Sequence, residues 1–391
     1  MIIPTDPAVT DGVPAARKAA TDAGSPAFDV SRWAQPLELA LDALYAAQPG
    51  QAVTGQLCAS DGFPAGLSEM AGRRLHEALV QPVRYVVEAG GARWRPQLLL
   101  AVIDMLGADS ARFGPLAAAM ELMHTGSLMI DDVQDRAVLR RGRVPAHAVF
   151  GLATTLNAGT AAYFAFDQVL RSVDDDPVLR SAMYQVMLGA LRSAHAGQGL
   201  DLQGHRAEMD VAAATGRAQE VLDLVRLTHR LKSGAPVRAC MEAGALLAGA
   251  APQLQAALGS FGDAVGTSYQ VIDDVLDLDG VVRGGQVTKK VGEDLFNGKV
   301  TMPLAHAVGL LPRREMQRLW KGVRNGRASA WRVRRAAAAL RACGALQVSR
   351  DEAYTAVRRE WANVTGLVED SPARRAVWVM ADQAVRRTRI A

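Results

Sequence analysis

Two short acidic runs of the same design are the residues best suited to chemistry in this sequence. Residues 131–135 read DDVQD and residues 273–277 read DDVLD, and each run follows an apolar stretch typical of a helix. Carboxylates at positions i and i+4 lie on one helix face. Acids so close repel one another in a dry cleft unless a hard divalent cation takes their oxygens as ligands. Two such runs facing each other across a cavity would form a magnesium-loaded site for a diphosphate.

Basic residues flank the first acidic run on both sides. Upstream, Arg93 and Arg95 lie beside a glycine pair and could clamp a phosphate, although arginines at a helix start also serve solubility. Cations a turn or two beyond metal-binding acids suit a polyanion that touches both. The arginines that follow the run are Arg136, Arg140, Arg141 and Arg143.

Other polar residues in apolar surroundings have two interpretations each. His124 lies two turns before the first acidic run on the same face, as either a hydrogen-bonded core residue or a ligand-binding one. Lys232 is costly to bury unpaired, so it either reaches solvent or meets an anion. Lys289 and Lys299, with an aspartate between them, are spaced along a loop in a way that suits diphosphate and metal contacts.

The elements that must position these residues are helices. Alanine and leucine are abundant, aromatic residues make up 5% of the chain, and no convincing block of alternating β-branched residues appears, so we expect an all-α fold. Apolar helices over 115–130 and 254–278 deliver the two acidic runs. Residues 202–217 are expected to form a surface excursion.

The amino-terminal part differs in composition from the rest. Residues 1–28 are rich in Pro, Gly, Asp and Ala and are expected to form a mobile leader. An amphipathic helix over 31–48 could pack on the main domain or on a second subunit. We therefore divide the chain into a partly disordered leader with an amphipathic helix, 1–66, and a catalytic domain, 67–391.

Charge and hydropathy indicate which partners and which cellular compartment to expect for this chain. Residues 311–391 hold 18 Lys/Arg against 7 Asp/Glu, or +11, so the remainder of this +4 chain carries −7. A basic end could meet nucleic acid or anionic lipid, but arginines spread along helical faces between alanines and acids favour a solvated surface and no nucleic-acid partner. The three cysteines are far apart in sequence, and neither a signal peptide nor a run of about 20 apolar residues is present. We expect a cytoplasmic protein without stable membrane insertion.

In order along the chain, several segments resemble those of the all-trans isoprenyl diphosphate synthases, the polyprenyl synthetase family. The resemblance covers roughly residues 68–350. It implies the isoprenoid synthase fold, a bundle of about a dozen helices around a deep central cavity, usually as a homodimer. The segments that carry it are GGARWRP, ELMHTGSLMIDDVQDRAVLRRG, PAHAVFG, GQGLD, the pair Lys232 and Ser233, YQVIDDVLD and KKVGEDLFNGKVTMP.

The resemblance also implies a role for each matching residue. Three magnesium ions would be held mainly by Asp131, Asp135 and Asp273, supported by Asp132, Asp274 and Asp277. The diphosphate of the allylic substrate would meet Arg140, Lys232 and Lys299. That of isopentenyl diphosphate would meet Arg95, His124 and Arg141. Further residues expected to line the cavity are Ser233, Gln270 and Lys289.

The reaction implied is a prenyl transfer by ionisation, condensation and elimination. Metal ions and cations neutralise the leaving diphosphate, apolar walls keep water from the allylic cation, and no side chain with a tuned pKa is needed as general base. The sequence around the first run looks closest to the geranylgeranyl-diphosphate-forming branch. Small residues at Gly126 and Ser127 leave Met123 or Met120 as the floor of the product tunnel, which predicts about twenty carbons, with twenty-five possible.

One position departs from the family pattern. The glycine pair is normally followed by a lysine that grips isopentenyl diphosphate, and here that residue is Ala92. Arg93 could replace it from the neighbouring position. The alternative is a terpene cyclase on the same fold, which ionises a prenyl diphosphate and cyclises the cation. A third possibility, an inactive partner subunit, is disfavoured because both acidic runs are intact.

Overall fold

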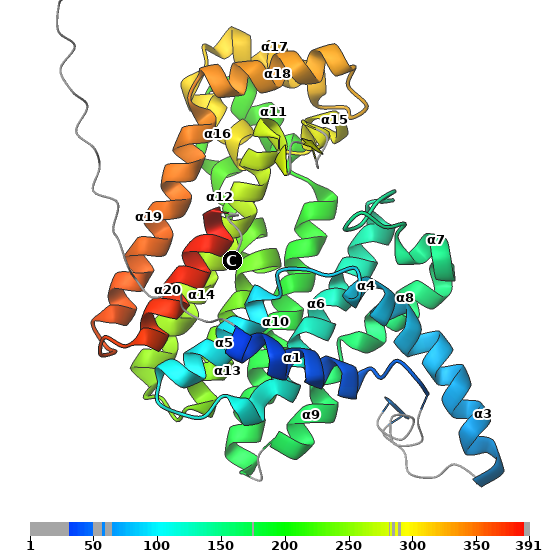
Figure 1. Ribbon diagram of the computed structural model, residues 1–391. Coiled ribbons are helices and arrows are strands. Elements are labelled where there is room, and N and C mark those ends of the chain that lie inside the picture. The colour runs from blue at the N-terminus through cyan, green and yellow to red at the C-terminus, as the bar shows by residue number, and fades with distance from the viewer. Residues whose placement is uncertain are drawn as a thin grey trace, which may run out of the picture.

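The longest described helix, α14 (Pro252–Asp279), lies beside α20 (Pro372–Arg386) and α19 (Ala345–Thr365) in Figure 1. It packs against α13 (Ala235–Leu247) on one side and α19 on another. Pro252 occupies its first turn, where the missing amide hydrogen costs nothing, and Gly280 ends it with a φ of 80°. The second acidic run therefore forms the last turns of a well-defined helix.

A computed structural model describes residues 31–49, 57–58, 65–173, 176–280, 282–283, 286–287 and 291–386. The expected leader, 1–28, and Lys289 lie outside these residues. The remaining helices before α13 are α1 (Ser31–Leu44), α3 (Ala65–Leu75), α4 (Gln81–Val87), α5 (Trp94–Met105), α6 (Gly114–Gln134), α7 (Ala146–Phe150), α8 (Leu152–Ala162), α9 (Ala165–Val173), α10 (Pro177–Gln203), α11 (Arg206–Thr215) and α12 (Gln219–His229).

Beyond α14 the chain forms a carboxy-terminal group of helices. Directly after α14, β1 (Val282–Arg283) pairs antiparallel with β2 (Gln286–Val287). Short π-helical or 3₁₀ turns lie earlier in the chain, at η1 (His76–Val80), η2 (Ala111–Phe113) and η3 (Arg230–Gly234). The prediction of an all-α fold is confirmed, since β1 and β2 form the only strand pair among the described residues. The later helices are α15 (Glu293–Asn297), α16 (Met302–Leu310), α17 (Arg313–Val323), α18 (Ala330–Ala342), α19 and α20 (Pro372–Arg386).

The core is a layer of helices that are apolar on every side. In α5 the stretch from Leu98 to Ile103 is completely inaccessible to solvent, because α6, α13 and α20 all pack against it. A helix apolar all round belongs inside a bundle. No helix within the described residues is both long and apolar enough to span a bilayer.

Helix α1 joins this same core. Trp33 and Leu37 are fully buried against α6 and α5, so of the two sequence-based alternatives α1 packs on the main bundle. The indole of Trp33 donates a hydrogen bond to Asp104 Oδ2 at 2.8 Å, and Arg32 pairs with the same carboxylate.

The expectation of a surface excursion over 202–217 was wrong. Most of this segment forms α11, which buries Met209, Ala212 and Ala213 and packs against α17. Apolar residues at i, i+3 and i+4 are the helical signal, and the charged residues between them obscured it.

Candidate active site

The first acidic run occupies the carboxyl end of α6, which ends at Gln134. Asp132 is almost completely buried, and its Oδ1 accepts a 2.8 Å hydrogen bond from Arg140 Nε, while its Oδ2 has no hydrogen-bond partner within the described chain. Burial, and then the charge of Asp131, raise the pKa of Asp135 to about 6. The carboxylates are therefore close enough to repel one another.

Two lysines from distant segments converge on Asp201, near the end of α10. Lys232 Nζ lies 2.7 Å from Asp201 Oδ2 and 3.2 Å from Asp131 Oδ1, and Lys299 Nζ lies 2.9 Å from Asp201 Oδ1. Burial opposes the ionised carboxylate, but the two lysines outweigh burial and hold the pKa of Asp201 well below its usual range. Burial likewise opposes both ammonium groups, yet Asp201 raises their pKa values. Lys232 thus meets anions, which resolves the two interpretations left by the sequence.

Lys232 reaches this position because η3 lies against α10. A Cβ atom on Gly197 would stand 2.3 Å from the backbone nitrogen of Lys232, so only glycine allows the two backbones to approach this closely. A π-helical turn widens the helix locally and often occurs at functional sites. Here it brings Lys232 toward Asp131, while Ser233 beside it donates a 3.0 Å hydrogen bond to Gln270 of α14.

The second acidic run is more deeply enclosed than the first. Asp274 is 2% exposed; its Oδ2 accepts a hydrogen bond from the Met302 amide at 3.0 Å and lies 3.4 Å from His229 Nε2. Burial, followed by the charge of Asp294, raises the pKa of Asp274 well above its usual range. Asp277 Oδ2 accepts from the Asp294 amide at 3.3 Å. The second acidic run is therefore held in place by backbone amides of the segment that includes α15 and Met302.

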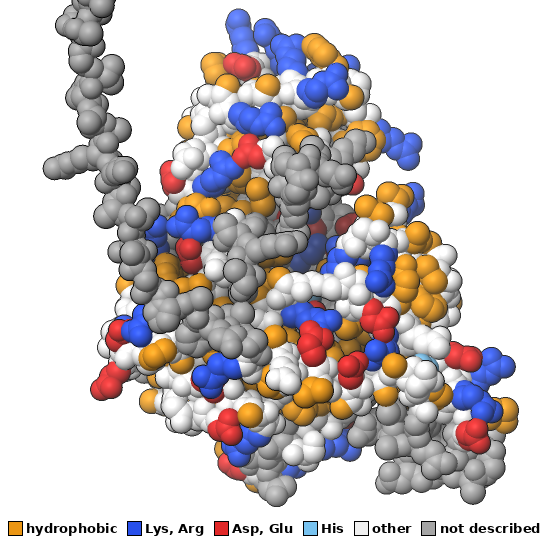
Figure 2. Space-filling view, viewed as in Figure 1, with side chains coloured by type: hydrophobic (Ala, Val, Ile, Leu, Met, Phe, Trp, Pro, Cys, Tyr) orange, Lys and Arg blue, Asp and Glu red, His pale blue; other side chains and the backbone are white. Residues whose placement is uncertain are grey.

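Lys299 connects the two acidic runs. It pairs with Asp201 on the side of α6 and α10, and the charges of Asp294 and Asp274 also raise its pKa. A series of carboxylates and ammonium groups thus extends from Asp131 to Asp274. Figure 2 shows a recess on this face of the molecule that contains both acidic and basic side chains.

The donor groups in this recess fit a hard divalent cation. Within the described residues no three His, Cys, Asp or Glu side chains converge as a ready metal cage. However, Asp132 Oδ2 and Gln198 Oε1 are buried oxygens without hydrogen-bond partners within the described chain, and burial, followed by the charge of Asp131, raises the pKa of Asp135. Oxygen donors and excess acidity are what magnesium requires, and its preference for retained water fits a recess open to solvent.

A second cationic group lies around the middle of α6. The buried Glu121 senses the charges of Arg141, Arg93 and Arg95, although burial is the larger influence and raises its pKa. Burial, reinforced by Arg95 and Arg141, lowers the pKa of His124 well below its usual value, so the imidazole is neutral near pH 7. Arg95 lies 4.5 Å above the ring of Trp94 and 5.1 Å from that of Tyr269. Three guanidinium groups around one carboxylate leave positive charge for an anion.

The residues beside Ala92 are arranged differently from the sequence-based expectation. Arg93 has a φ of 44°; its guanidinium pairs with Glu38 of α1 and donates to the Val87 carbonyl at 3.2 Å. The proposal that Arg93 replaces the missing lysine is therefore not supported by its position, because its hydrogen bonds are directed at α1 and the end of α4. Ala92 is exposed and contributes no charge.

Arg141 occupies the space beside the glycine pair. It also has a positive φ, 50°, and donates to the carbonyl of Gly90. A Cβ on Gly91 would stand 2.9 Å from the Arg141 guanidinium carbon. The backbone of Gly90 and Gly91 thus holds the Arg141 side chain. This contact links the segment that carries Arg93 and Arg95 to the arginines that follow the first acidic run.

The residues predicted to set the product length differ in their burial and contacts. A Cβ on Gly126 would stand 2.4 Å from the Gly159 carbonyl oxygen of α8, so Gly126 faces a close helix contact, and its part in setting product length stays a prediction. Ser127 is half-buried and donates to the His124 carbonyl at 2.7 Å. Met123 is half-buried against the core and Met120 is nearly buried.

Sequence reasoning gave too little weight to residues that hold others. Asp201 entered the sequence analysis only as part of the segment GQGLD, yet it binds both lysines. Glu121 stands three residues before His124, on the same face, which was an available signal. Glu38 could not be found from sequence, because its pairing with Arg93 depends on how α1 docks.

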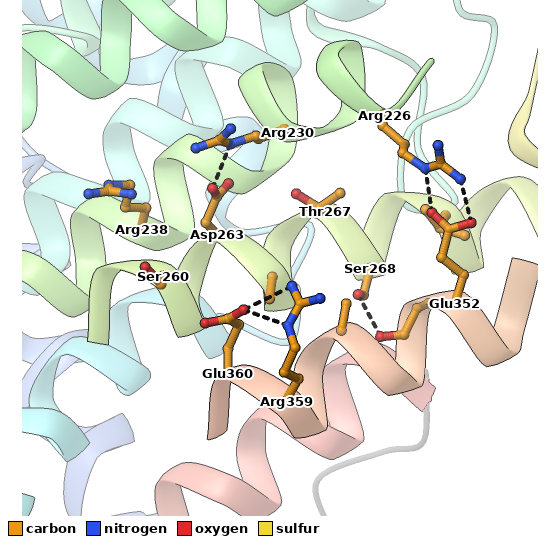
Figure 3. A pocket seen from close by; sticks show the side chains of 14 residues that line it. Arg226, Arg230, Arg238, Ser260, Asp263, Thr267, Ser268, Glu352, Arg359 and Glu360 are labelled. Carbon is orange, nitrogen blue, oxygen red and sulfur yellow. Dashed lines mark hydrogen bonds and ion pairs between the residues drawn. The ribbon is translucent and has the colours of Figure 1, made fainter. Parts of the chain in front are cut away.

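A separate polar hollow of about 350 Å³ lies on another face of α14 (Figure 3). Arg226 forms a two-pronged pair with Glu352, and Arg230 pairs with Asp263 at 2.7 Å. Arg359 pairs with Glu360 in the same hollow, and Arg238 pairs with Glu242 beside it. Each arginine of the hollow is thus engaged with an acid.

An all-helical bundle with an aspartate-rich turn at the end of two long helices defines the isoprenoid synthase class. The polyprenyl synthetase family model matches residues 76–340, and the chain belongs to that family. It is 30% identical over 329 residues to a short chain isoprenyl diphosphate synthase of Methanothermobacter thermautotrophicus, covering 82% of this chain and 96% of that protein.

Other relatives carry different product names. An octaprenyl diphosphate synthase of Escherichia coli is 31% identical over 307 residues, covering 78% of this chain and 88% of that one. The crystal structure of a geranylgeranyl pyrophosphate synthetase from Pyrococcus horikoshii superimposes with a TM-score of 0.72 at 23% identity, covering 91% and 96% of the two chains. The protein is a prenyltransferase, and its product length is not fixed by these similarities.

Proposed function

We propose that this prenyltransferase condenses isopentenyl diphosphate with an allylic diphosphate to give an all-trans prenyl diphosphate of about twenty carbons, geranylgeranyl diphosphate. The observation that carries the proposal is the presence of two separate cationic groups around one helix, α6, contributed by the segments that pack against it. Lys232, Lys299 and Arg140 surround its carboxyl end, and Arg95 and Arg141 lie near its middle. Two anionic substrates need two such groups.

The group at the end of α6 is the proposed site for the allylic diphosphate. Three magnesium ions would be held by Asp131, Asp135 and Asp273, with Asp132, Asp274 and Asp277 in support, and would neutralise the diphosphate as the C–O bond breaks. Lys232 and Lys299, held by Asp201 before substrate arrives, would contact the same phosphate oxygens. Their raised pKa values keep both charged at neutral pH.

The group near the middle of α6 is the proposed site for isopentenyl diphosphate. Arg95 and Arg141 would bind its diphosphate, with His124 as a neutral hydrogen-bond donor beside them. Glu121 would keep the guanidinium groups together, and Arg93, bound to Glu38, would support the loop without touching the phosphates. Because Ala92 stands where the family pattern has a lysine, we expect weaker binding of isopentenyl diphosphate. The other cations of this group would still form its site.

The chain's own residues would guide the cation after ionisation. Apolar walls of α6, α8 and α10 exclude water, and Gln270, held by Ser233, would stand at the side of the cavity. The isopentenyl double bond attacks the allylic cation, a new C–C bond forms, and a proton leaves to the released diphosphate. Met123 and Met120 remain the proposed floor for a twenty-carbon chain, with Ser127 above them.

A homodimer is part of the same proposal. Exposed apolar side chains gather around α7 and the start of α8, including Val144, Val149 and Leu152, each at least half exposed. Figure 2 shows hydrophobic atoms grouped on that side of the molecule. A large exposed apolar area on a soluble domain is typical of a protein contact.

The proposal is tested by incubating the purified protein with magnesium, isopentenyl diphosphate and allylic diphosphates of five to twenty carbons, and reading the product masses. We expect elongated diphosphates that accumulate at twenty carbons, and no product when magnesium is chelated. A hydrocarbon or alcohol formed from geranylgeranyl diphosphate without isopentenyl diphosphate would instead establish a cyclase. No product from any pair would contradict both assignments.

A further inference from the structure

Helices α17 and α18 carry a concentration of exposed positive charge that the prenyl transfer does not use. We define the basic cap as Arg313, Arg314, Arg318 and Lys321 of α17 with Arg334 and Arg335 of α18. All six side chains are exposed, and none forms an ion pair with a residue that the structure describes. Glu315 is the only acid among residues 313–341. Figure 2 shows basic side chains crowded at this end of the molecule.

An exposed indole lies within the basic cap. Trp331 is 59% exposed, on the first turn of α18, and the guanidinium of Arg335 lies 5.3 Å from its ring. An exposed indole beside cations offers a partner surface both an apolar ring and a hydrogen-bond donor. Tryptophan prefers the boundary between hydrocarbon and water, where its ring is apolar and its N–H can bind a headgroup.

The basic cap is joined directly to the candidate active site. The loop between α17 and α18 packs on the chain before Lys299: the Ala328 amide bonds to the Phe296 carbonyl at 3.4 Å, and a Cβ on Gly298 would stand 2.8 Å from the Arg324 carbonyl. Arg206 of α11 fixes the same turn by donating to the Asn297 and Gly298 carbonyls. A partner surface bound at the basic cap would therefore lie beside the part of the candidate active site that we propose for the allylic diphosphate.

We propose that the basic cap docks the protein reversibly on an anionic lipid bilayer, with Trp331 in the headgroup layer. Charge complementarity carries this: the six exposed side chains of the basic cap are all cationic and residues 313–341 contain a single acid, Glu315, so an anionic plane attracts this face of the molecule. The choice of a bilayer over nucleic acid rests on the proposed function, because a twenty-carbon diphosphate is an amphiphile that partitions into membranes.

The test is flotation of the purified protein with vesicles of phosphatidylcholine alone or with about one third phosphatidylglycerol. We expect binding only to the anionic vesicles, weakened by 0.5 M salt because exposed charges are screened. A variant with Arg314→Gln, Arg318→Gln and Arg335→Gln should bind roughly tenfold or more weakly. Trp331→Phe should remove most of the blue shift of tryptophan emission that accompanies binding.

A matched control removes the same charge elsewhere. Arg74→Gln, Arg112→Gln and Arg358→Gln alter three exposed arginines on α3, η2 and α19 and should leave vesicle binding unchanged. Equal loss in both triple variants, equal binding to neutral vesicles, or tight binding of single-stranded RNA without vesicle binding would overturn the proposal. Activity with soluble short-chain substrates should stay at the wild-type level in the cap variant, so a failure of docking is distinguishable from a failure of the proposed reaction.

Discussion

Among single residues, Asp201 has the widest influence on the candidate site. It accepts hydrogen bonds from both Lys232 and Lys299, and the charge of Lys299 opposes protonation of Lys232. Without the carboxylate, two buried ammonium groups would face each other with less compensation. Asp201 is the one carboxylate that raises the pKa values of both lysines, while Asp131 adds to the effect on Lys232 and Asp294 and Asp274 add to that on Lys299.

Asp201→Asn should raise the KM for the allylic substrate, and the difference from wild type should grow as the pH rises toward 9.5. The reason is that Asp201 positions both ammonium groups and raises both lysine pKa values, so the variant lysines lose their protons at lower pH. Steady-state kinetics from pH 7 to 9.5 measure this. Asp223→Asn, on an exposed face of α12, is the control; parallel KM profiles for all three proteins would show that Asp201 does not hold the lysines.

Glu352 gives a stability effect that is separate from catalysis. Burial opposes its ionised form, but hydrogen bonds from His306 and Arg226 lower its pKa to about 2. A lowered carboxyl pKa stabilises the fold above the unfolded value near 4.5 and loses this contribution as pH falls toward 2. Glu352→Gln should cost roughly 1–2 kcal/mol at pH 7, since the pair is partly screened by water.

The pH dependence of that loss provides the measurement. Urea unfolding of wild type and Glu352→Gln at pH 7, 4.5 and 3 should show curves that converge as the pH falls. Glu315→Gln, an exposed carboxylate on α17, should remain parallel to wild type. A constant difference between Glu352→Gln and wild type at all three pH values would mean that the carboxylate charge contributes nothing.

At the scale of elements, the close contact between α10 and η3 sets the position of Lys232. Gly197→Ala would force a Cβ to within 2.3 Å of the Lys232 nitrogen, so the helices must separate. Overpacking of this kind typically costs about 1–3 kcal/mol. We also expect kcat/KM to fall, because Lys232 moves away from Asp131.

Gly189 offers a control on the same helix. Nothing lies within 4 Å of a Cβ placed there, and Gly189→Ala should stabilise α10 by about 0.5–1 kcal/mol, since alanine loses less backbone entropy. Thermal unfolding and kinetics of both variants separate the two effects. Two alanine variants with the same melting temperature and activity would contradict the close-contact argument.

The elements were more predictable from sequence than their contacts. The two acid-bearing helices and their neighbours follow from apolar periodicity, which is a local property. The orientation of Gly126 toward α8, the direction of Arg93 toward Glu38 and the bridge at Asp201 depend on helix packing between distant segments. The acidic runs were found because their chemistry is repeated locally, whereas Glu121 and Asp201 act through residues far away in the chain.

At the scale of the whole molecule, the proposed dimer makes a direct prediction. Leu152→Glu places a charge in the exposed apolar group around α7 and α8, and burying an unpaired charge in a contact is strongly unfavourable. Light scattering should report half the wild-type mass. Val379→Glu, on the exposed side of α20, should keep the dimer; a wild-type mass for Leu152→Glu would exclude this surface as the contact.

Helix α1 also matters for anyone who defines the smallest expressible fragment of this protein. The family match begins at residue 76, yet Glu38 holds Arg93, and Trp33 and Arg32 bind the carboxylate of Asp104, whose side chain is only 8% exposed. A gene cut at residue 76 would leave that acid without two donors and uncover the apolar faces of α5 and α6. We therefore expect the smallest stable fragment to start at residue 31 or earlier, well ahead of the segment that the family model matches.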